Sequence, residues 1–218
     1  MAEVDLLRAL PRTKRNIQKR KDAKDPAVVA ISKQYGEMYF DGPREYGYGG
    51  YRYDGRWLPV ARDIVAHFGL KPGMRVLDIG CAKGFLVKDL MLACPGLEAF
   101  GLDISLYALM HCEPEVIGRL HLGTAERLPF PDRSFDCALC LNTVHNFPRP
   151  RAIKVMQEIE RVCGGRAFVQ VDSYHTPEQK EIFESWVLTA EFYDDPRGWV
   201  ELFQEAGYTG DYYWTIIE

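Results

Sequence analysis

The sequence contains no long hydrophobic run and no internal repeat. No window approaches the roughly 18 apolar residues that a membrane-spanning helix needs. Residues 1–20 are charged throughout and lack the apolar core of a secretory signal. We therefore expect a soluble protein that has no membrane partner and works in the cytoplasm.

A disulfide or zinc pattern is also missing. The six cysteines are scattered among segments that read as core elements, and a chain of 218 residues needs no disulfide to fold. Cys137 and Cys140 have a C-x-x-C spacing, but they lie in an apolar strand pattern, where side chains three apart point to opposite faces. We expect reduced thiols without a zinc or redox role.

Positive charge is concentrated near one end of the chain. Residues 1–24 hold eight Lys and Arg against three acids, a net charge of +5, so the remainder must carry −9 to give the total of −4. A protein that binds a polyanion normally spreads positive charge over its folded surface. The acidic body argues against a nucleic-acid partner, and we expect the basic arm to be a solvated terminus.

From about residue 75 onward, short apolar segments typical of buried strands alternate with segments of helical spacing. This alternation predicts an α/β fold: a doubly wound, mostly parallel sheet of six or seven strands with helices on both faces. The expected strands are 75–80, 97–104, 118–123, 135–142, 166–172 and 210–218. The expected helices are 27–35, 58–68, 84–94, 105–112, 151–165 and two within 177–208, broken at Asp195-Pro196. Such sheets bind ligands at the carboxyl ends of their strands.

The first strand runs into a turn with the sequence "VLDIGCAKGF", residues 76–85. A glycine at a strand end lets the backbone approach a ligand, and the following helix start presents free N–H groups. The G-x-G-x-x-G fingerprint of dinucleotide sites is absent, because Ala82 and Phe85 stand where two of its glycines would fall. This turn therefore argues against a nicotinamide cofactor.

The turn resembles motif I of the class I S-adenosylmethionine-dependent methyltransferases, with Ala82 in place of the middle glycine. Three further segments are similar to the same family in the same order: "GLDIS" (101–105), "GTAERLPF" (123–130) and "RVCGG" (161–165), the last shortened by one residue. The resemblance covers about residues 57–172. It implies a Rossmann-like methyltransferase fold, methyltransferase activity and S-adenosylmethionine as cofactor.

The resemblance also implies roles for single residues. Asp103 would accept hydrogen bonds from the ribose hydroxyls, Asp78 would support the methionyl ammonium, Glu126 would lie by the adenine, and Asn142 would face the methionine portion. Asp78 could instead only stiffen the turn, and Glu126 could be an exposed loop acid. The cofactor-binding residues expected are Asp78, Gly80, Cys81, Ala82, Gly84, Asp103, Ile104, Ala125, Glu126 and Asn142.

Methyl transfer is an in-line displacement that needs a positioned base only if the acceptor must lose a proton. The candidate catalytic residues follow the fourth and fifth strands: His145, Asp172 and His175. The imidazole of His145 titrates near neutral pH, although this residue could instead pack against Phe147. These side chains, with Asn142, could alternatively gather a divalent cation; we predict no metal.

The segment "REYGYGGYRYDGRW", residues 44–57, holds four tyrosines, four glycines and a tryptophan. Tyrosine offers a flat apolar face and a hydroxyl, which suit a polar acceptor, and Arg44, Arg52 and Arg56 could hold a phosphate or carboxylate. We expect residues 39–57 to form a lid over cofactor and acceptor; a packed loop is the alternative. The substrate-binding residues expected are Tyr46, Tyr48, Tyr51, Arg52, Arg56 and Trp57.

This assignment divides the chain into residues 1–57, with the basic arm, a short helix and the lid, and residues 58–218, the S-adenosylmethionine-binding domain. The family's core usually ends in two antiparallel strands, but here the chain has one, so either the sheet has six strands or a partner strand comes from elsewhere. An edge rich in Tyr212, Tyr213 and Trp214 needs a cover, and a homodimer would supply one.

The predicted function is methyl transfer to a small polar metabolite, such as a sugar or a nucleotide-linked sugar. One alternative is an RNA or DNA methyltransferase that uses the basic arm, but "LNTVHN" stands where an N-P-P-Y-like motif would be expected. A second is a protein that holds the cofactor as a regulatory ligand without turnover. The identity of the acceptor and the atom methylated stay open.

Overall fold

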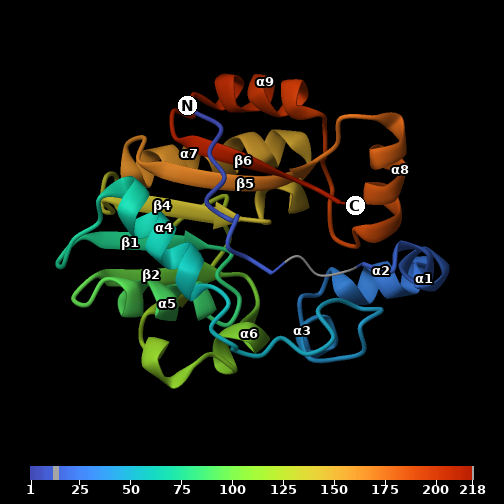
Figure 1. The fold of residues 1–218 in the computed structure, drawn as a ribbon, viewed down its shortest axis with the longest axis horizontal. Coiled ribbons are helices and arrows are strands. Elements are labelled where there is room, and N and C mark those ends of the chain that lie inside the picture. Colours follow the sequence, from blue (N-terminus) through green and yellow to red (C-terminus); the bar gives the residue numbers. More distant parts are fainter. Residues whose placement is uncertain (12–14, 218) are drawn as a thin grey trace.

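A computed structural model describes residues 1–11 and 15–217. Residues 12–14 of the expected basic arm and residue 218 of the expected last strand lie outside the described part. Within it, six parallel strands form one sheet in the order β3-β2-β1-β4-β5-β6 (Figure 1). The strands are β1 (Arg75–Ile79), β2 (Glu98–Asp103), β3 (Leu120–Leu122), β4 (Cys137–Leu141), β5 (Ala167–Ser173) and β6 (Asp211–Ile216).

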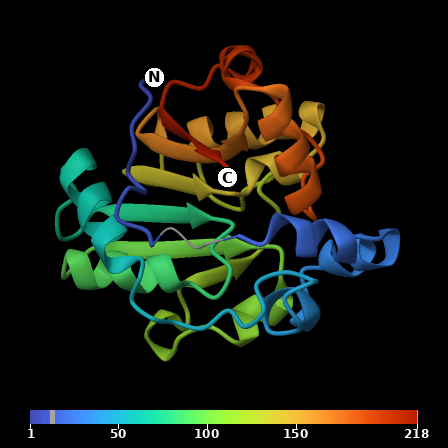
Figure 2. The same ribbon diagram turned by 45° about the vertical axis from the view of Figure 1, so that its right-hand side comes forward.

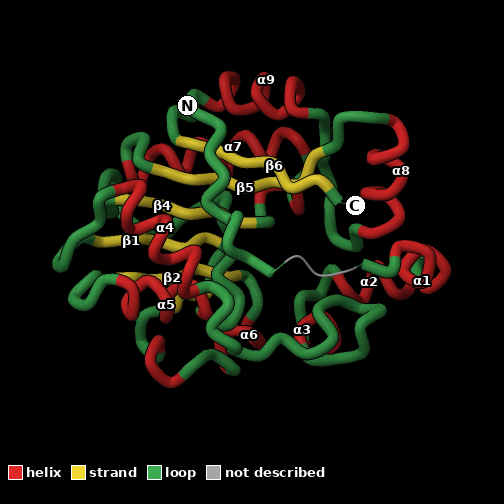
Figure 3. Tube along the Cα trace, viewed as in Figure 1, coloured by secondary structure: helices red, strands yellow, loops and turns green. Residues whose placement is uncertain are grey.

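Helices cover both faces of the sheet, which confirms the predicted doubly wound fold (Figure 1, Figure 3). α4 (Leu58–Phe68) and α5 (Phe85–Ala93) bury their apolar sides in one core cluster, and α7 (Arg149–Cys163) and α9 (Pro196–Ala206) bury theirs in another. Cys137 and Cys140 are fully buried in different clusters, as their spacing predicts. No helix of the described ranges is long and apolar enough to cross a membrane.

Short-range signals set the limits of α7 and α9. Asp195 begins α9 by accepting a hydrogen bond from the N–H of Gly198 at 2.9 Å, and Pro196 occupies the first turn. Each helix ends at a glycine with left-handed backbone, Gly164 with φ of 61° and Gly207 with φ of 70°. The predicted break at Asp195-Pro196 therefore coincides with a capped helix start.

The last strand runs parallel to its neighbour. α8 (Pro177–Trp186) and α9 carry the chain from the end of β5 back to its beginning, so β6 can enter the sheet in the same direction as β5. The described residues contain no antiparallel pair at this edge. Of the two arrangements that the sequence left open, the structure has the six-stranded sheet.

Residues 2–4 lie along the outer edge of β6. The N–H of Val4 donates to the carbonyl of Tyr212 at 2.9 Å, and the N–H of Tyr212 donates to the carbonyl of Ala2 at 3.0 Å. Leu6 is buried in the core cluster beneath α4. The expectation of a solvated terminus is therefore wrong for this segment, because its apolar residues complete a core face. The same chain, rather than a second subunit, covers the start of this edge.

Three short helices stand at the carboxyl ends of the strands: α1 (Ile17–Ala23), α2 (Pro26–Ser32) and α3 (Glu37–Phe40). Together with the loop 41–57 we call them the cap, residues 15–57. The cap and α8 lie side by side beyond the strand ends (Figure 1, Figure 2), and α1 contacts α8. Shorter elements are α6 (Leu106–Met110) and 3-10 turns at Pro114–Val116 and Val144–Asn146. The tyrosine- and glycine-rich stretch thus lies where sheets of this type bind ligands.

Candidate active site

A carboxylate from the end of β2 holds the turn that follows β1. Asp103 Oδ2 accepts a hydrogen bond from the N–H of Ala82 at 2.7 Å, and Oδ1 accepts one from the N–H of Ser105 at 2.8 Å. Burial raises the pKa of Asp103, although these backbone N–H groups act against the rise. Each carboxylate oxygen keeps a lone pair for another donor. Asp103 therefore fixes two turns and can still accept a hydroxyl group.

The small residues of this turn are required by backbone shape and by packing. Gly80 has φ of +83°, and a Cβ there would lie 2.0 Å from Oγ1 of Thr143. Gly84 begins α5 with φ of +75°, and a Cβ there would meet Leu120 at 3.0 Å. Ala82 adopts φ of +50°, a region that glycine enters more easily. Side chains occupy the space beside both glycines, so the close approach of a cofactor here stays a prediction.

Asp78 is a buried carboxylate that has no hydrogen-bond partner in the described part of the chain. It is 4% exposed, and among the described residues no group donates a hydrogen bond to it. Burial, and after it the charge of Asp103, raises the pKa of Asp78 to about 7. The adjacent Cys81 thiol is also buried, and burial followed by the charge of Asp78 raises its pKa well above the usual value. A cationic group bound beside Asp78 and Asp103 would favour the ionised forms of both carboxyl groups.

The other residues expected to contact the cofactor differ in exposure and in their partners. Ile104, which follows Asp103, is 58% exposed and offers an apolar surface, whereas Ala125 is buried in the core. Glu126 is bound by the guanidinium of Arg151 on α7, which lowers the pKa of its carboxyl group. Asn142 ends β4 with an exposed side chain and φ of +52°. Glu126 thus has a structural partner that the sequence pattern did not reveal.

The candidate catalytic residues do not all meet. His145 is buried, and its Nδ1 accepts the N–H of Asp172 at 3.4 Å. Burial lowers the pKa of His145 and raises that of Asp172, while each charge favours the other's ionised form. A neutral imidazole that accepts at Nδ1 carries its proton on Nε2. His175 is exposed beyond β5, and the described residues give its side chain no contact with this pair.

An ion pair ties the cap to the turn after β1. Lys83 is 6% exposed, and its Nζ donates to the two carboxylate oxygens of Asp41 at 2.8 and 2.6 Å. The same ammonium donates to the carbonyl of Tyr51 at 2.9 Å, and Tyr107 donates its hydroxyl to Asp41. Lys83 lies between Ala82 and Gly84, so one residue of the turn holds the cap in place.

Two further contacts strengthen this attachment. The ring of Tyr51 stacks on Phe85, the first residue of α5, with centroids 4.7 Å apart. Ser105 donates its hydroxyl to the carbonyl of Tyr35 at 2.5 Å. The sequence motifs do not single out Lys83, although a lysine inside an otherwise small and apolar turn is a signal that it needs a buried partner.

Tyr48 belongs to the loop of the cap, where its ring contacts those of Tyr39, Phe40 and Tyr51. Its residue keeps 43% of its surface accessible, yet burial is the main cause that raises the pKa of its hydroxyl. The charges of Asp103 and Asp172 raise the same pKa further. Among the expected acceptor-binding residues, Tyr48 is therefore the one whose pKa is raised by the charges of both Asp103 and Asp172.

The remaining expected acceptor-binding residues are less central. Arg56 is engaged by Asp54, to whose carboxylate Nε donates at 2.9 and 2.7 Å. Trp57 precedes α4 and packs against the core cluster beneath it. Arg52 is exposed and Tyr46 is half-buried. In the part of the chain that the structure describes, none of these four contacts the acids at the strand ends.

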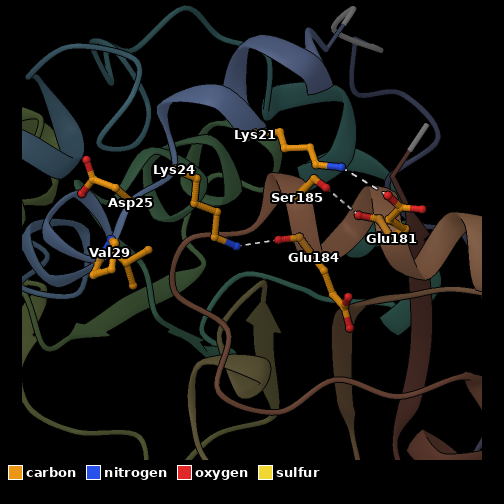
Figure 4. A pocket seen from close by; sticks show the side chains of 8 residues that line it. Lys21, Lys24, Asp25, Val29, Glu181, Glu184 and Ser185 are labelled. Carbon is orange, nitrogen blue, oxygen red and sulfur yellow. Dashed lines mark hydrogen bonds and ion pairs between the residues drawn. The ribbon is translucent and has the colours of Figure 1, made fainter.

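No group of three or more His, Cys, Asp or Glu side chains in the described part is arranged to hold a metal ion. A surface hollow lies between α1, α2 and α8, where Figure 4 shows Lys21 reaching Glu181. Another hollow lies near Arg161 and Gly164, at the carboxyl end of α7. Neither hollow includes the acids at the strand ends, so we define the site by the convergence of its side chains.

Comparison with known proteins identifies the fold and the family. Residues 77–169, from β1 into β5, match the model of a family described as "Methyltransferase domain". The demethylmenaquinone methyltransferase of Symbiobacterium thermophilum is 33% identical over 125 residues, which are 51% of this chain and 48% of that protein. The chain therefore spans about half the length of this curated relative.

Solved structures agree with the fold. A Haloferax volcanii methyltransferase in complex with the activator Trm112 gives a TM-score of 0.55 at 21% identity, over 67% of this chain and 66% of that chain. Phosphoethanolamine N-methyltransferase 2 of Haemonchus contortus, in complex with phosphomonomethylethanolamine and S-adenosylhomocysteine, gives 0.54 at 18% identity, over 89% and 44%. Likeness at these identities concerns the fold.

The parallel sheet, the glycine turn and the acids after its first two strands define a Rossmann-like α/β protein. The family match makes the assignment specific, and it confirms the one predicted from the motifs. Residues 77–169 match this methyltransferase family, and the match agrees with the resemblance of the motifs to the class I S-adenosylmethionine-dependent methyltransferases.

We expect Asp78→Asn to weaken the pH dependence of stability in the ligand-free protein. The folded state keeps a proton on Asp78 up to about pH 7, whereas an unfolded chain releases it near ~3.9. The folded state then binds more protons, so the free energy of unfolding should fall as pH rises through this window. Urea denaturation across the window should show a smaller fall in Asp78→Asn, and Asp22→Asn, an exposed carboxyl, is the control. An unchanged slope would contradict the assignment.

We expect Lys83→Met to loosen the cap. The substitution removes the hydrogen bonds from Lys83 Nζ to Asp41 and Tyr51. A charged hydrogen bond contributes ~1.5 kcal/mol or more, so trypsin cleavage within residues 44–56 should become about tenfold faster. Lys71→Met, at an exposed lysine before β1, should leave the rate unchanged. Equal cleavage of Lys83→Met and the wild type would show that the ion pair does not hold the cap.

Proposed function

We propose that this chain transfers a methyl group from S-adenosylmethionine to a small polar metabolite. The observation that carries the proposal is the pair of buried carboxylates at the ends of β1 and β2, Asp78 and Asp103. Asp78 has no hydrogen-bond donor among the described residues, and Asp103 has lone pairs to spare. An ammonium group and a pair of ribose hydroxyls suit these two acids.

The other residues around the pair fit the same cofactor. The exposed side chain of Ile104 would cover one face of the adenine, and Asn142 would reach the methionine portion from the end of β4. The solved Haemonchus contortus enzyme, similar in fold, holds S-adenosylhomocysteine. When bound, the cofactor supplies a methyl carbon attached to a positively charged sulfur. The protein then has to position the acceptor in line with that bond and exclude water.

Asp172 and His145 would handle the acceptor's proton. Because Nδ1 of His145 is engaged by the N–H of Asp172, its neutral ring presents a donor at Nε2. We therefore assign His145 to orient the acceptor and Asp172, whose pKa is raised by burial, to accept the proton. His175, exposed and separate from this pair, has no role in the proposed reaction.

The acceptor would lie between the strand ends and the cap. Tyr48 is exposed on the loop of the cap, and Lys83 and Tyr51 hold the cap against the turn after β1. A tyrosine lid suits a polar ring such as a sugar, free or linked to a nucleotide. We also propose that residues 1–57 act as the acceptor-binding part and residues 58–218 as the cofactor-binding domain. The names of the similar proteins cover unlike acceptors, demethylmenaquinone and a phosphoethanolamine, and so do not choose between them.

A nucleic-acid acceptor is less well supported. In the basic arm, Arg20 is 7% exposed and donates to the carbonyls of Glu45 and Gly47, and Lys24 donates to carbonyls at the end of α8. Arg20 and Lys24 therefore do not form the exposed basic surface that an extended polyanion such as RNA or DNA requires. A regulatory protein that binds the cofactor without turnover is separated from an enzyme by the assay below.

Methyl-labelled S-adenosylmethionine, incubated with the protein and a metabolite extract, should yield a labelled small molecule that mass spectrometry can identify. Calorimetry should show binding of S-adenosylhomocysteine and none of NADH. Asp103→Ala should abolish measurable cofactor affinity with an unchanged circular dichroism spectrum, because it removes the ribose acceptor. Binding of NADH instead, or full affinity in Asp103→Ala, would reject the proposal; cofactor binding without any product would favour the regulatory alternative.

Asp172→Asn should lower kcat by about 10²–10⁴-fold with little change in cofactor affinity, since it removes the proposed base. In the wild type, kcat should rise with pH through the raised pKa of Asp172, because the carboxylate must be ionised to accept a proton. His175→Ala is the matched control and should keep wild-type turnover. Equal turnover of Asp172→Asn and the wild type would remove Asp172 from the reaction.

A further inference from the structure

Three arginines from separate parts of the cap meet at one tryptophan. The guanidinium carbons of Arg15, Arg20 and Arg44 lie 5.8, 4.9 and 5.3 Å from the ring centroid of Trp186. Arg15 precedes α1, Arg20 belongs to α1, Arg44 comes from the loop of the cap, and Trp186 ends α8. The aromatic ring gathers three like charges that would otherwise separate.

No carboxylate neutralises this cluster in the described part of the chain. Arg20 is 7% exposed, and its guanidinium donates only to backbone carbonyls, those of Glu45 at 2.7 Å and Gly47 at 3.3 Å. Burial, and after it the charge of Arg44, lowers the pKa of Arg20 to about 10. Burial likewise lowers the pKa of Arg44, and Arg15 adds to this effect. The cluster holds positive charge that the protein itself leaves uncompensated.

The neighbouring lysines differ in this respect. In the hollow of Figure 4, Lys21 pairs with Glu181, and Lys24 donates to the carbonyls of Glu184 and Val187 at 2.5 and 2.6 Å. These contacts hold the end of α8, and therefore Trp186, against α1. The lysines thus hold the cap against α8. In the described part of the chain, the guanidinium groups of the arginines beside them have no anionic partner.

The cluster is in electrostatic contact with the proposed reaction site. The charge of Arg15 acts to lower the pKa of Asp172, and the charge of Arg44 acts to lower that of Tyr48. Arg44 is exposed to solvent by its accessible surface even though burial dominates its pKa, as is the case for Tyr48. Both residues belong to the exposed loop of the cap.

We propose that Arg15, Arg20 and Arg44, arranged around Trp186, bind a phosphoryl group of the acceptor. Three guanidinium groups match a doubly charged tetrahedral anion better than a singly charged planar one, because together they supply more positive charge and more N–H donors. Arg20 and Arg44 each donate to the carbonyl of Gly47, and the remaining N–H groups of the cluster would bind the anion's oxygens. The acceptor is then a small phosphorylated molecule, whose phosphoryl group lies at the cap and whose nucleophile lies at Asp172. The assignment of the bound phosphoryl group to a methyl acceptor rests on the proposed methyl transfer. The binding of phosphate to the three arginines does not depend on that proposal.

Inorganic phosphate is the probe for the cluster itself. Isothermal calorimetry at constant ionic strength should show phosphate binding to the ligand-free chain. Arg15→Gln and Arg44→Gln should each weaken it by about tenfold, the effect of one charge-assisted contact. Both replace accessible side chains, so folding is checked by circular dichroism, and Arg62→Gln on the exposed side of α4 is the control. Absence of phosphate binding, equal binding of acetate, or unchanged affinity in both variants would overturn the proposal.

A second measurement separates this inference from the proposed function. The metabolite extract is treated with alkaline phosphatase before the labelling assay, and the labelled product should disappear. Persistence of an unphosphorylated product would overturn the phosphoryl assignment while supporting methyl transfer. Arginine-dependent phosphate binding in a protein that shows no affinity for S-adenosylmethionine would instead support the anion site and reject the proposed function.

Discussion

The carboxylate of Asp103 is the constraint on which the site depends. It accepts N–H groups from the turn after β1 and from the turn after β2, so the two strand ends keep one spacing. Ala82 can hold its left-handed backbone because its N–H has this fixed partner. The next residue, Lys83, then projects its ammonium toward Asp41 of the cap. One buried acid thus connects the sheet, the turn after β1 and the cap.

The cost of this arrangement is the desolvation of negative charge. Asp78 and Asp103 are both buried at adjacent strand ends, and the pKa of each is raised. A protein selected only for stability would replace one of them with an apolar side chain of similar size. Folding alone therefore does not explain their presence together, which fits the cofactor site that we propose.

Local signals were sufficient to predict the sheet and most of its helices. The apolar segment before Gly80, the capping of α9 by Asp195 and the glycine at 164 act over a few residues, so the sequence shows them directly. The family pattern located Asp78 and Asp103 for the same reason. The parallel direction of β6 was not foreseen, because it depends on the length of the α8–α9 crossover rather than on the strand's own residues.

The cap and the cluster around Trp186 could not be predicted in this way. Lys83 and Asp41 are 42 residues apart, and Lys24 and Glu184 are 160 apart. A basic segment with no visible partner reads as solvated, although Arg20 is buried in the structure. Likewise Glu126 fits the family motif, but its ion pair with Arg151 depends on tertiary packing. Arg52 is predicted from the composition of its segment, but its exposure also depends on tertiary packing.

The pairing of residues 2–4 with β6 has a consequence for how the molecule assembles. The N–H of Ala2 also donates to the carboxylate of Asp211, a contact across 209 residues. During synthesis this segment must wait until β6 has left the ribosome, and the flank of the growing sheet stays open meanwhile. A bulky fusion partner placed before Met1 would sit beside the last strand to dock, so the position of an affinity tag can decide whether the recombinant protein matures or aggregates.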